Sequence, residues 1–125
     1  MGKIPNKPEE IFDDFKHVIT SQFGEDVISI ALYGSGAKGE YVPKKSDINF
    51  LVVLTENGIR RLSNAMDAAK SFEKRNVAVP LFLTEKYILS SLDSFPIEFL
   101  NMKKYHQPVF GKDILGTIEI DSQDL

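Results

Sequence analysis

The sequence contains no cysteine. Disulfide bonds, thiolate nucleophiles and zinc or iron–sulfur centres with cysteine ligands are therefore excluded. The chain also has no apolar run of about 18 residues, the length that a membrane-spanning helix requires. Its first ten residues, MGKIPNKPEE, lack the apolar core of a secretory signal. These absences favour a cytoplasmic protein that does not have a membrane as a partner.

An excess of positive charge is missing as well. The 15 Lys and Arg residues are outnumbered by 18 Asp and Glu residues, and the net charge is −3. Because nucleic-acid-coating proteins usually carry a strongly basic surface, we do not expect nucleic acid as a partner.

The remaining composition is that of an ordinary globular protein, with 42% hydrophobic and 26% charged residues. A chain of 125 residues suffices for one domain with a real core but not for two. We therefore expect residues 1–125 to form a single domain. The acidic end, TIEIDSQDL, carries no signal that terminates an element, so the chain is also compatible with the N-terminal part of a longer protein.

The spacing of apolar residues predicts a small α/β protein of the mixed (α+β) kind, in which a mixed sheet packs against helices. Steps of three and four residues indicate helices, and short β-branched runs such as VISIALY indicate buried strands. Pro80 in the third strand favours a sheet edge or a bulge. The expected elements are a helix over 8–24, strands over 27–33 and 47–54, a helix over 59–75, a strand over 77–83, helices over 84–89 and 94–106, and an extended piece with a turn over 108–115.

The aromatic and histidine side chains have ordinary interpretations in this scheme. His17 and His106 lie on expected helices beside charged residues and are interpreted as surface or partly buried histidines. Six phenylalanines fall at core-facing positions, and we expect them in the core rather than in a base-stacking platform: Phe12, Phe15, Phe72, Phe82, Phe95 and Phe99.

A glycine-rich loop follows the first expected strand. Its residues 34–39, GSGAKG, match the pattern G-x-G-x-x-G of dinucleotide-binding folds. Only the segment EYVPKKS separates this loop from Asp47, where the second strand opens, whereas a parallel crossover needs a dozen or more residues. The two strands are therefore expected to be antiparallel neighbours, and the dinucleotide interpretation is rejected. A Walker A loop is excluded too, because no Gly-Lys-Ser/Thr follows at the required spacing.

The stretch from Tyr33 to Leu54 consists of a strand end, Gly-Ser, a spacer, and then Ser-Asp-Ile-Asn, which opens a second strand. This arrangement resembles the signature of the DNA-polymerase-β-like nucleotidyltransferase superfamily. The likeness is strongest to its minimal, single-domain bacterial branch, and outside this stretch it extends only to the order of elements. The resemblance implies a nucleotidyltransferase-type fold and a site for a nucleoside triphosphate (NTP).

The chemistry of this pattern follows from strand geometry. Alternate residues on a strand point to one face, so positions 47 and 49 present two side chains together. Where both are carboxylates they hold Mg²⁺, which binds the triphosphate and activates an acceptor hydroxyl. On this resemblance Gly34 and Ser35 would hold the phosphates and Asp47 would be a metal ligand. Independently of it, Lys44 belongs to a local basic patch with Lys38 and Lys45, which would attract the phosphates of a nucleotide.

The sequence departs from the superfamily pattern at two acids. Position 49 is Asn, a neutral and weak metal ligand, and the third strand, VAVPLFL, contains no acid where the superfamily places one. Asp47 is then the remnant of the catalytic set, and we expect activity to be impaired or lost. Glu40 or Glu85 are the alternatives that would replace the missing ligands.

Three functions remain open on the sequence alone. The chain is an inactive or impaired nucleotidyltransferase-like protein that retains nucleotide binding, an active enzyme with relocated metal ligands, or a non-catalytic interaction module. The third follows from the resemblance, since minimal members of the superfamily accompany a helical protein partner, for example as antitoxins. The plain alternatives are also open: a simple tight turn at Gly34-Ser35, a structural Asp47 at the start of a strand, and solvated lysines at 38, 44 and 45.

Overall fold

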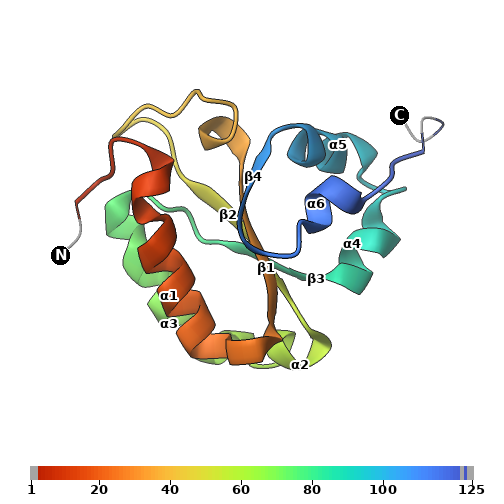
Figure 1. Ribbon diagram of the computed structural model, residues 1–125, viewed down its shortest axis with the longest axis horizontal. Coiled ribbons are helices and arrows are strands. Elements are labelled where there is room, and N and C mark those ends of the chain that lie inside the picture. The colour runs from red at the N-terminus through yellow and green to blue at the C-terminus, as the bar shows by residue number, and fades with distance from the viewer. Residues whose placement is uncertain (1–2, 122, 124–125) are drawn as a thin grey trace.

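The structure is a computed structural model that describes residues 3–121 and 123. A four-stranded mixed sheet, in the order β3-β2-β1-β4, carries helices on both faces (Figure 1). The strands are β1 (Val27–Tyr33), β2 (Asn49–Leu54), β3 (Leu81–Thr84) and β4 (His106–Gly111). The α-helices are α1 (Phe12–Phe23), α2 (Glu56–Ile59), α3 (Leu62–Lys70), α4 (Glu85–Ser91), α5 (Pro96–Lys104) and α6 (Ile114–Thr117), and short 3₁₀ turns are η1 (Pro8–Ile11), η2 (Gly24–Asp26), η3 (Gly34–Gly36) and η4 (Ser71–Arg75).

The first two strands are antiparallel neighbours, as the short connection predicts. Tyr33 at the end of β1 pairs with Asn49 at the start of β2. The pairing of β2 with β3 is parallel, and that of β1 with β4 is antiparallel. The expected mixed sheet is therefore confirmed, and β1 and β2 form its centre.

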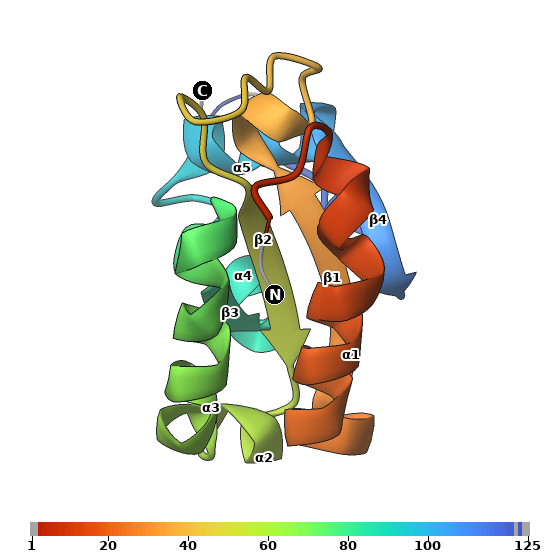
Figure 2. The same cartoon turned by 90° about the vertical axis from the view of Figure 1, so that its left-hand side faces the viewer.

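Alternation along the central strands divides the core into two layers. One layer lies under α1 and α3, which run side by side across one face (Figure 2). In it Phe15 of α1 stacks on Phe50 of β2, with ring centroids 4.1 Å apart, and meets Phe72 edge-on at 5.4 Å. The other layer lies under α4, α5 and α6, and its fully or nearly buried members are Ala31, Leu51, Val53, Ile88, Phe99, Ile114, Leu115 and Ile118.

Pro80 lies at an edge strand and beside a change of register. An isolated parallel bridge joins Ile48 to Val77, whereas β3 proper pairs Leu51 with Leu81, so one extra residue is accommodated between the two. The regular strand is therefore Leu81–Thr84, shorter than the expected 77–83. The expected helix over 59–75 is likewise interrupted, since α3 begins at Leu62 and ends in η4.

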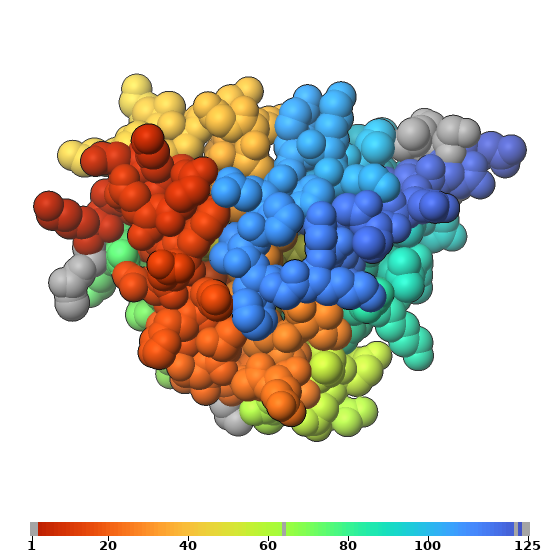
Figure 3. All heavy atoms as spheres, viewed as in Figure 1, coloured from red at the N-terminus to blue at the C-terminus, as the bar shows by residue number. Residues whose placement is uncertain are grey.

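The expected helix over 94–106 is wrong at its end. α5 stops at Lys104, and His106 opens β4, which covers the edge of β1 that β2 leaves free. Hydrogen bonding of that edge outweighs the local helical pattern, because backbone N–H and C=O groups of a central strand need partners. β4 lies beside α1 on the surface shown in Figure 3. Phe95 is also not a core residue: it precedes α5, and 49% of it is exposed.

Among the described residues no helix is long and apolar enough to cross a membrane. The acidic C-terminal end noted above lies partly outside the described residues.

Candidate functional site

The glycine loop forms a compact turn at the end of β1. The carbonyl of Gly34 accepts hydrogen bonds from the N–H groups of Ala37 (3.0 Å) and Lys38 (3.1 Å). The carbonyl of Ser35 accepts from Lys38 (3.2 Å) and Glu40 (2.9 Å). The turn is therefore held by its own backbone, and its carbonyls are directed back into the loop.

Gly34 is required where it stands. Its φ of +78° lies in the left-handed region that favours glycine. A Cβ added there would also lie 3.0 Å from Nδ2 of Asn49. The glycine thus lets the turn approach the first residue of β2 closely, which brings the two halves of the sequence signature together.

Asp47 and Asn49 flank the fully buried Ile48. Asp47 is exposed and Asn49 is half-buried, and since both alternate with Ile48 they share the face that carries α4, α5 and α6. The Asn49 amide donates a long hydrogen bond of 3.4 Å to the Asp47 carbonyl. The structure thus brings Gly34, Asp47 and Asn49 together, as the signature requires.

Asn76 fixes the segment that carries Asp47, a role that was not predicted from the sequence. Its side-chain amide donates to the carbonyl of Ser46, and its own carbonyl accepts from the N–H of Ile48 at 2.8 Å. The same amide donates to the Tyr41 hydroxyl at 3.3 Å. Asp47 therefore lies between two residues that are both bonded to Asn76. A left-handed Asn just after a helix, here at φ +70°, is a signal that could have marked it.

Lys44 lies on the tip of the loop between the glycine turn and Asp47. Ser46 N–H donates to the Val42 carbonyl at 2.8 Å, and the turn so closed holds Lys44 at φ +70°. A left-handed conformation costs a non-glycine residue about 1–2 kcal/mol. Lys44 is exposed and belongs to the same loop as Asp47, and none of the ion pairs among the described residues involves its side chain.

The strand register shows which residue of this chain occupies the place where a third acid would lie beside Asp47 and Asn49. Ile48 is bridged to Val77, and the N–H of Ala78 donates to the Ile48 carbonyl at 3.0 Å. Since Val77 joins the layer under α1, the next residue, Ala78, lies on the same side as Asp47 and Asn49. Within the part of the chain that the structure describes, no three His, Cys, Asp or Glu side chains gather closely enough to hold a metal ion.

The two candidate replacements differ in position. Glu85 follows Thr84, which pairs with Leu54 at the far end of β2, and its carboxylate lies 3.5 Å from Lys112. Glu85 therefore cannot complete a site at Asn49, and this part of the sequence interpretation is wrong. Glu40 is exposed and remains in the glycine loop, where its N–H is bonded to Ser35.

Tyr33 and His106 continue the row of paired residues that starts at Asn49. Burial raises the pKa of Tyr33, so its phenol is neutral near pH 7. The His106 ring has both nitrogens engaged at 2.8 Å, Nδ1 with the Lys103 carbonyl and Nε2 with the Asp113 carboxylate. Through these two bonds the His106 ring joins the end of α5 to the start of α6.

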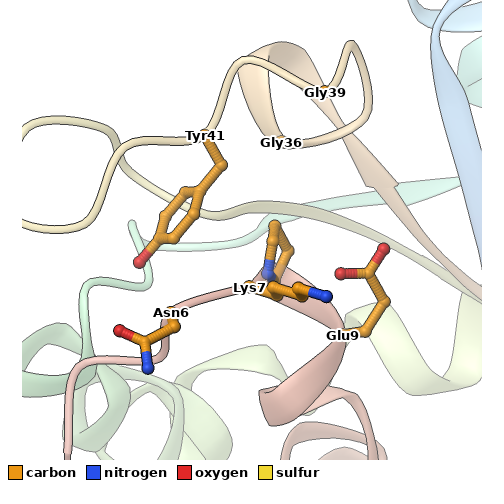
Figure 4. A pocket seen from close by; sticks show the side chains of 7 residues that line it. Asn6, Lys7, Glu9, Gly36, Gly39 and Tyr41 are labelled. Carbon is orange, nitrogen blue, oxygen red and sulfur yellow. The ribbon is translucent and has the colours of Figure 1, made fainter.

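A hollow of about 200 Å³ borders the glycine turn on its other side (Figure 4). It is lined by Asn6, Lys7, Pro8, Glu9, Gly36, Gly39 and Tyr41. Gly36 packs toward Pro8 and Leu32, so this hollow lies on the side of α1 and not on that of Asp47. Its volume is below the roughly 300–1,000 Å³ of typical small-molecule sites, and it does not join the groups of the signature.

The chain matches one protein family in sequence and several solved structures in fold. The sequence model of the family described as nucleotidyltransferase domain matches residues 14–120. Spectinomycin adenyltransferase AAD(9) from Enterococcus faecialis, solved with ATP and spectinomycin, has a TM-score of 0.61 and 15% identity, over 95% of this chain and 62% of that one. No curated protein matches in sequence.

Two further solved structures share the fold. A toxin–antitoxin solved with AMP-PNP has a TM-score of 0.53 and 14% identity, over 82% of this chain and 74% of that one. A protein from Sulfolobus solfataricus described as a nucleotidyltransferase has a TM-score of 0.52 and 19% identity, over 85% and 81%. At these identities the likeness establishes the fold alone.

Proposed function

Because the chain belongs to the nucleotidyltransferase domain family, of the DNA-polymerase-β-like type, we propose that it binds a nucleoside triphosphate at the Gly34-Ser35 turn and has impaired or no transfer activity. One observation carries this proposal: the turn at Gly34 closely approaches Asn49, the first residue of β2. This end of the strand offers one carboxylate, that of Asp47, beside the neutral side chain of Asn49.

The binding part of the proposal assigns a role to each residue of the signature. Gly34 allows close backbone approach, and Ser35 offers a hydroxyl and an N–H group to phosphate. Lys44 contributes a positive charge on the flanking loop. Asp47, with Asn49 as a weak neutral ligand, would hold a cation that arrives with the nucleotide.

These residues suit one Mg²⁺ shared with a triphosphate and do not suit a pair of catalytic metals. Mg²⁺ keeps several waters and is commonly bound through one or two carboxylates plus substrate phosphates, which Asp47 and a nucleotide can provide. A bound Mg²⁺ would neutralise phosphate charge there. Two-metal transfer needs further acids, and the positions beside Asp47 are filled by Asn49 and Ala78.

An active enzyme with relocated ligands is the second candidate, and Glu40 is the residue that favours it. Its backbone is tied to Ser35 at 2.9 Å and its side chain is exposed, so the carboxylate is available at the turn. In that case metal-dependent transfer from ATP is measurable in the wild type and is lost on Glu40→Gln.

A non-catalytic interaction module is the third candidate. It is supported by the toxin–antitoxin neighbour and by large apolar side chains that are exposed on β3, α4 and the segments flanking them, namely Val79, Leu81, Tyr87, Leu89, Phe95 and Ile97. A helical protein partner would bury such side chains.

The experiment that tests the proposal is an isothermal titration of ATP with and without Mg²⁺. Wild type, Asp47→Ala and the control Asp67→Ala are compared, since Asp67 is exposed on α3 over the opposite layer. Mg²⁺-dependent binding that is lost only in Asp47→Ala is the expected result. If ATP fails to bind wild type in either condition, the nucleotide site is refuted and the interaction module is favoured.

A further inference from the structure

β4 brings a second segment of the chain to the glycine turn. Tyr33 pairs with Asn49 on one side and with His106 on the other. Gly34 directly follows Tyr33, Tyr105 directly precedes His106, and Ile48 directly precedes Asn49, so the three residues lie at the same end of the sheet. The turn is thus flanked by the Asp47 segment on one side and by the end of α5 on the other, at the same end of the sheet (Figures 1 and 2).

Two lysines from separate elements converge on Tyr105. The Lys38 ammonium lies 5.0 Å from the centre of the Tyr105 ring, and the Lys104 ammonium lies 5.5 Å from it. The backbone N–H of Lys38 is bonded to the carbonyls of Gly34 and Ser35, so this lysine is part of the glycine turn. The two charges are therefore separated by no more than the sum of these distances, 10.5 Å.

Within residues 3–121, the positive charges of Lys38 and Lys104 are not paired with a carboxylate. None of the ion pairs formed among the described residues involves Lys38 or Lys104. Each contact with the Tyr105 ring stabilises a cation by only about 0.5–1 kcal/mol at an exposed site, and like charges repel. A polyanion bound between them would relieve that repulsion, since lysine binds phosphate as a point charge.

The backbone that carries Lys104, at the end of α5, is held in place by side-chain hydrogen bonds. Lys103 donates to the carbonyl of Ile118, and the His106 ring bridges the Lys103 carbonyl and the Asp113 carboxylate. These bonds tie the last turn of α5 to β4 and to the start of α6. Lys104 is consequently presented to the glycine turn from a rigid support, which favours binding by reducing the entropy that is lost.

We propose that Lys38 and Lys104, placed around Tyr105, form a polyphosphate clamp for the outer phosphates of the nucleotide. The inference rests on the proposed nucleotide site and extends it to the side of the turn opposite Asp47. A triphosphate lying over Gly34 and Ser35 would then meet Asp47 and its cation on one side and two ammonium groups on the other.

The test uses inorganic tripolyphosphate without metal, because this probe needs the clamp and not Asp47. It is titrated at low salt into wild type, Lys38→Gln, Lys104→Gln and the double variant. The matched control is Lys16→Gln, which removes a lysine that lies 5.1 Å over the ring of Phe110 near the other end of β4. Each single variant is expected to bind about fivefold more weakly and the double variant at least about tenfold, as the loss of exposed charge contacts implies.

The outcomes separate this inference from the proposed function. If ATP–Mg²⁺ binding depends on Asp47 while Lys38→Gln and Lys104→Gln bind both probes as wild type does, the clamp is refuted and the nucleotide site stands. If tripolyphosphate binding depends on both lysines but ATP does not bind wild type with or without Mg²⁺, the clamp stands as a polyphosphate site and the proposed function fails. An equal loss in Lys16→Gln, or no tripolyphosphate binding to wild type, would overturn the clamp.

Discussion

At the scale of single residues, Gly34 connects backbone conformation to the candidate site. We expect Gly34→Ala to lower the free energy of unfolding by about 2 kcal/mol, because the new Cβ meets a left-handed φ and the Asn49 amide. Urea denaturation measures this change. Gly24 is the matched control: its φ is +57°, yet a Cβ there has nothing within 4 Å. Gly24→Ala should therefore cost about 1 kcal/mol, and equal losses in the two variants would show that the Asn49 contact is unimportant.

Whether a residue of the site could be predicted from the sequence depends on how far along the chain its partners in the site lie. Gly34, Asp47 and Asn49 could be identified because a short loop joins two strands, and the pattern is read within one segment. Asn76 and Lys104 could not, since each reaches the site through strand pairing with a segment that lies far along the chain. The sequence shows that two acids are absent, but the neighbour of Asn49 on the third strand is assigned to Ala78 only by the bridge between Ile48 and Val77.

At the scale of elements, Asn76 links the end of η4 to the start of β2. Asn76→Asp keeps the shape of the side chain but loses the amide that donates to Ser46 and Tyr41. We expect it to lower the unfolding free energy by about 1–3 kcal/mol, because two partly buried hydrogen-bond acceptors lose their donor. Faster amide hydrogen exchange at Ile48 should accompany the loss. Asn76→Gly tolerates the left-handed φ, so retention of stability in that variant would contradict a role for the side chain.

The elements themselves were predictable to different degrees. The antiparallel pair β1–β2 follows from the length of its connection, and an edge position for the third strand follows from Pro80. β4 was predicted only in part: the extended piece expected over 108–115 contains its second half, but the helical pattern was continued to 106, because the start of β4 becomes a strand only by pairing with β1. The position of this boundary matters for the proposed clamp, since the pairing of β4 with β1 brings Tyr105 and Lys104 to the glycine turn.

At the scale of the whole molecule, stability is expected to depend on pH through Asp26, at the end of the sheet away from the site. A hydrogen bond from Thr55 at 2.6 Å, together with Arg61 and Asn57, lowers the pKa of Asp26 and outweighs the opposing effect of burial. A carboxyl group whose folded pKa is lowered contributes stability above its unfolded pKa of about 4, and that stability is lost as pH falls through the folded value.

The measurement is a series of urea denaturations from pH 6 down to about pH 3. Wild type should lose stability on acidification below about pH 4, and Asp26→Asn should lose less over the same interval although it is less stable at pH 6. Asp67→Asn, which changes an exposed aspartate on α3, serves as the control and should follow wild type. Parallel curves for wild type and Asp26→Asn would show that other carboxyl groups set the acid limit.

Catalysis would also be a property of the whole molecule, because the positions where the superfamily pattern places its acids, here Asp47, Asn49 and Ala78, come from two neighbouring segments of the sheet. Asn49→Asp alone is expected to leave nucleotidyl transfer from ATP unmeasurable, since removing a single catalytic group elsewhere costs about 10²–10³-fold and the position at Ala78 still lacks its acid. Asn49→Asp with Ala78→Asp would place three carboxylates side by side on β2 and the segment before β3.

The readout should not require a known acceptor. Mn²⁺ binding followed by electron paramagnetic resonance reports the charge of the site directly, and affinity should rise by roughly tenfold with each added carboxylate because affinity follows ligand charge. Pyrophosphate release from ATP then reports chemistry, and only the double variant is expected to show it. If Asn49→Asp alone releases pyrophosphate, a third acid is already present, and loss of that activity on Glu40→Gln would identify it. In that case the fold retains a complete site that differs from the superfamily pattern in the origin of one ligand.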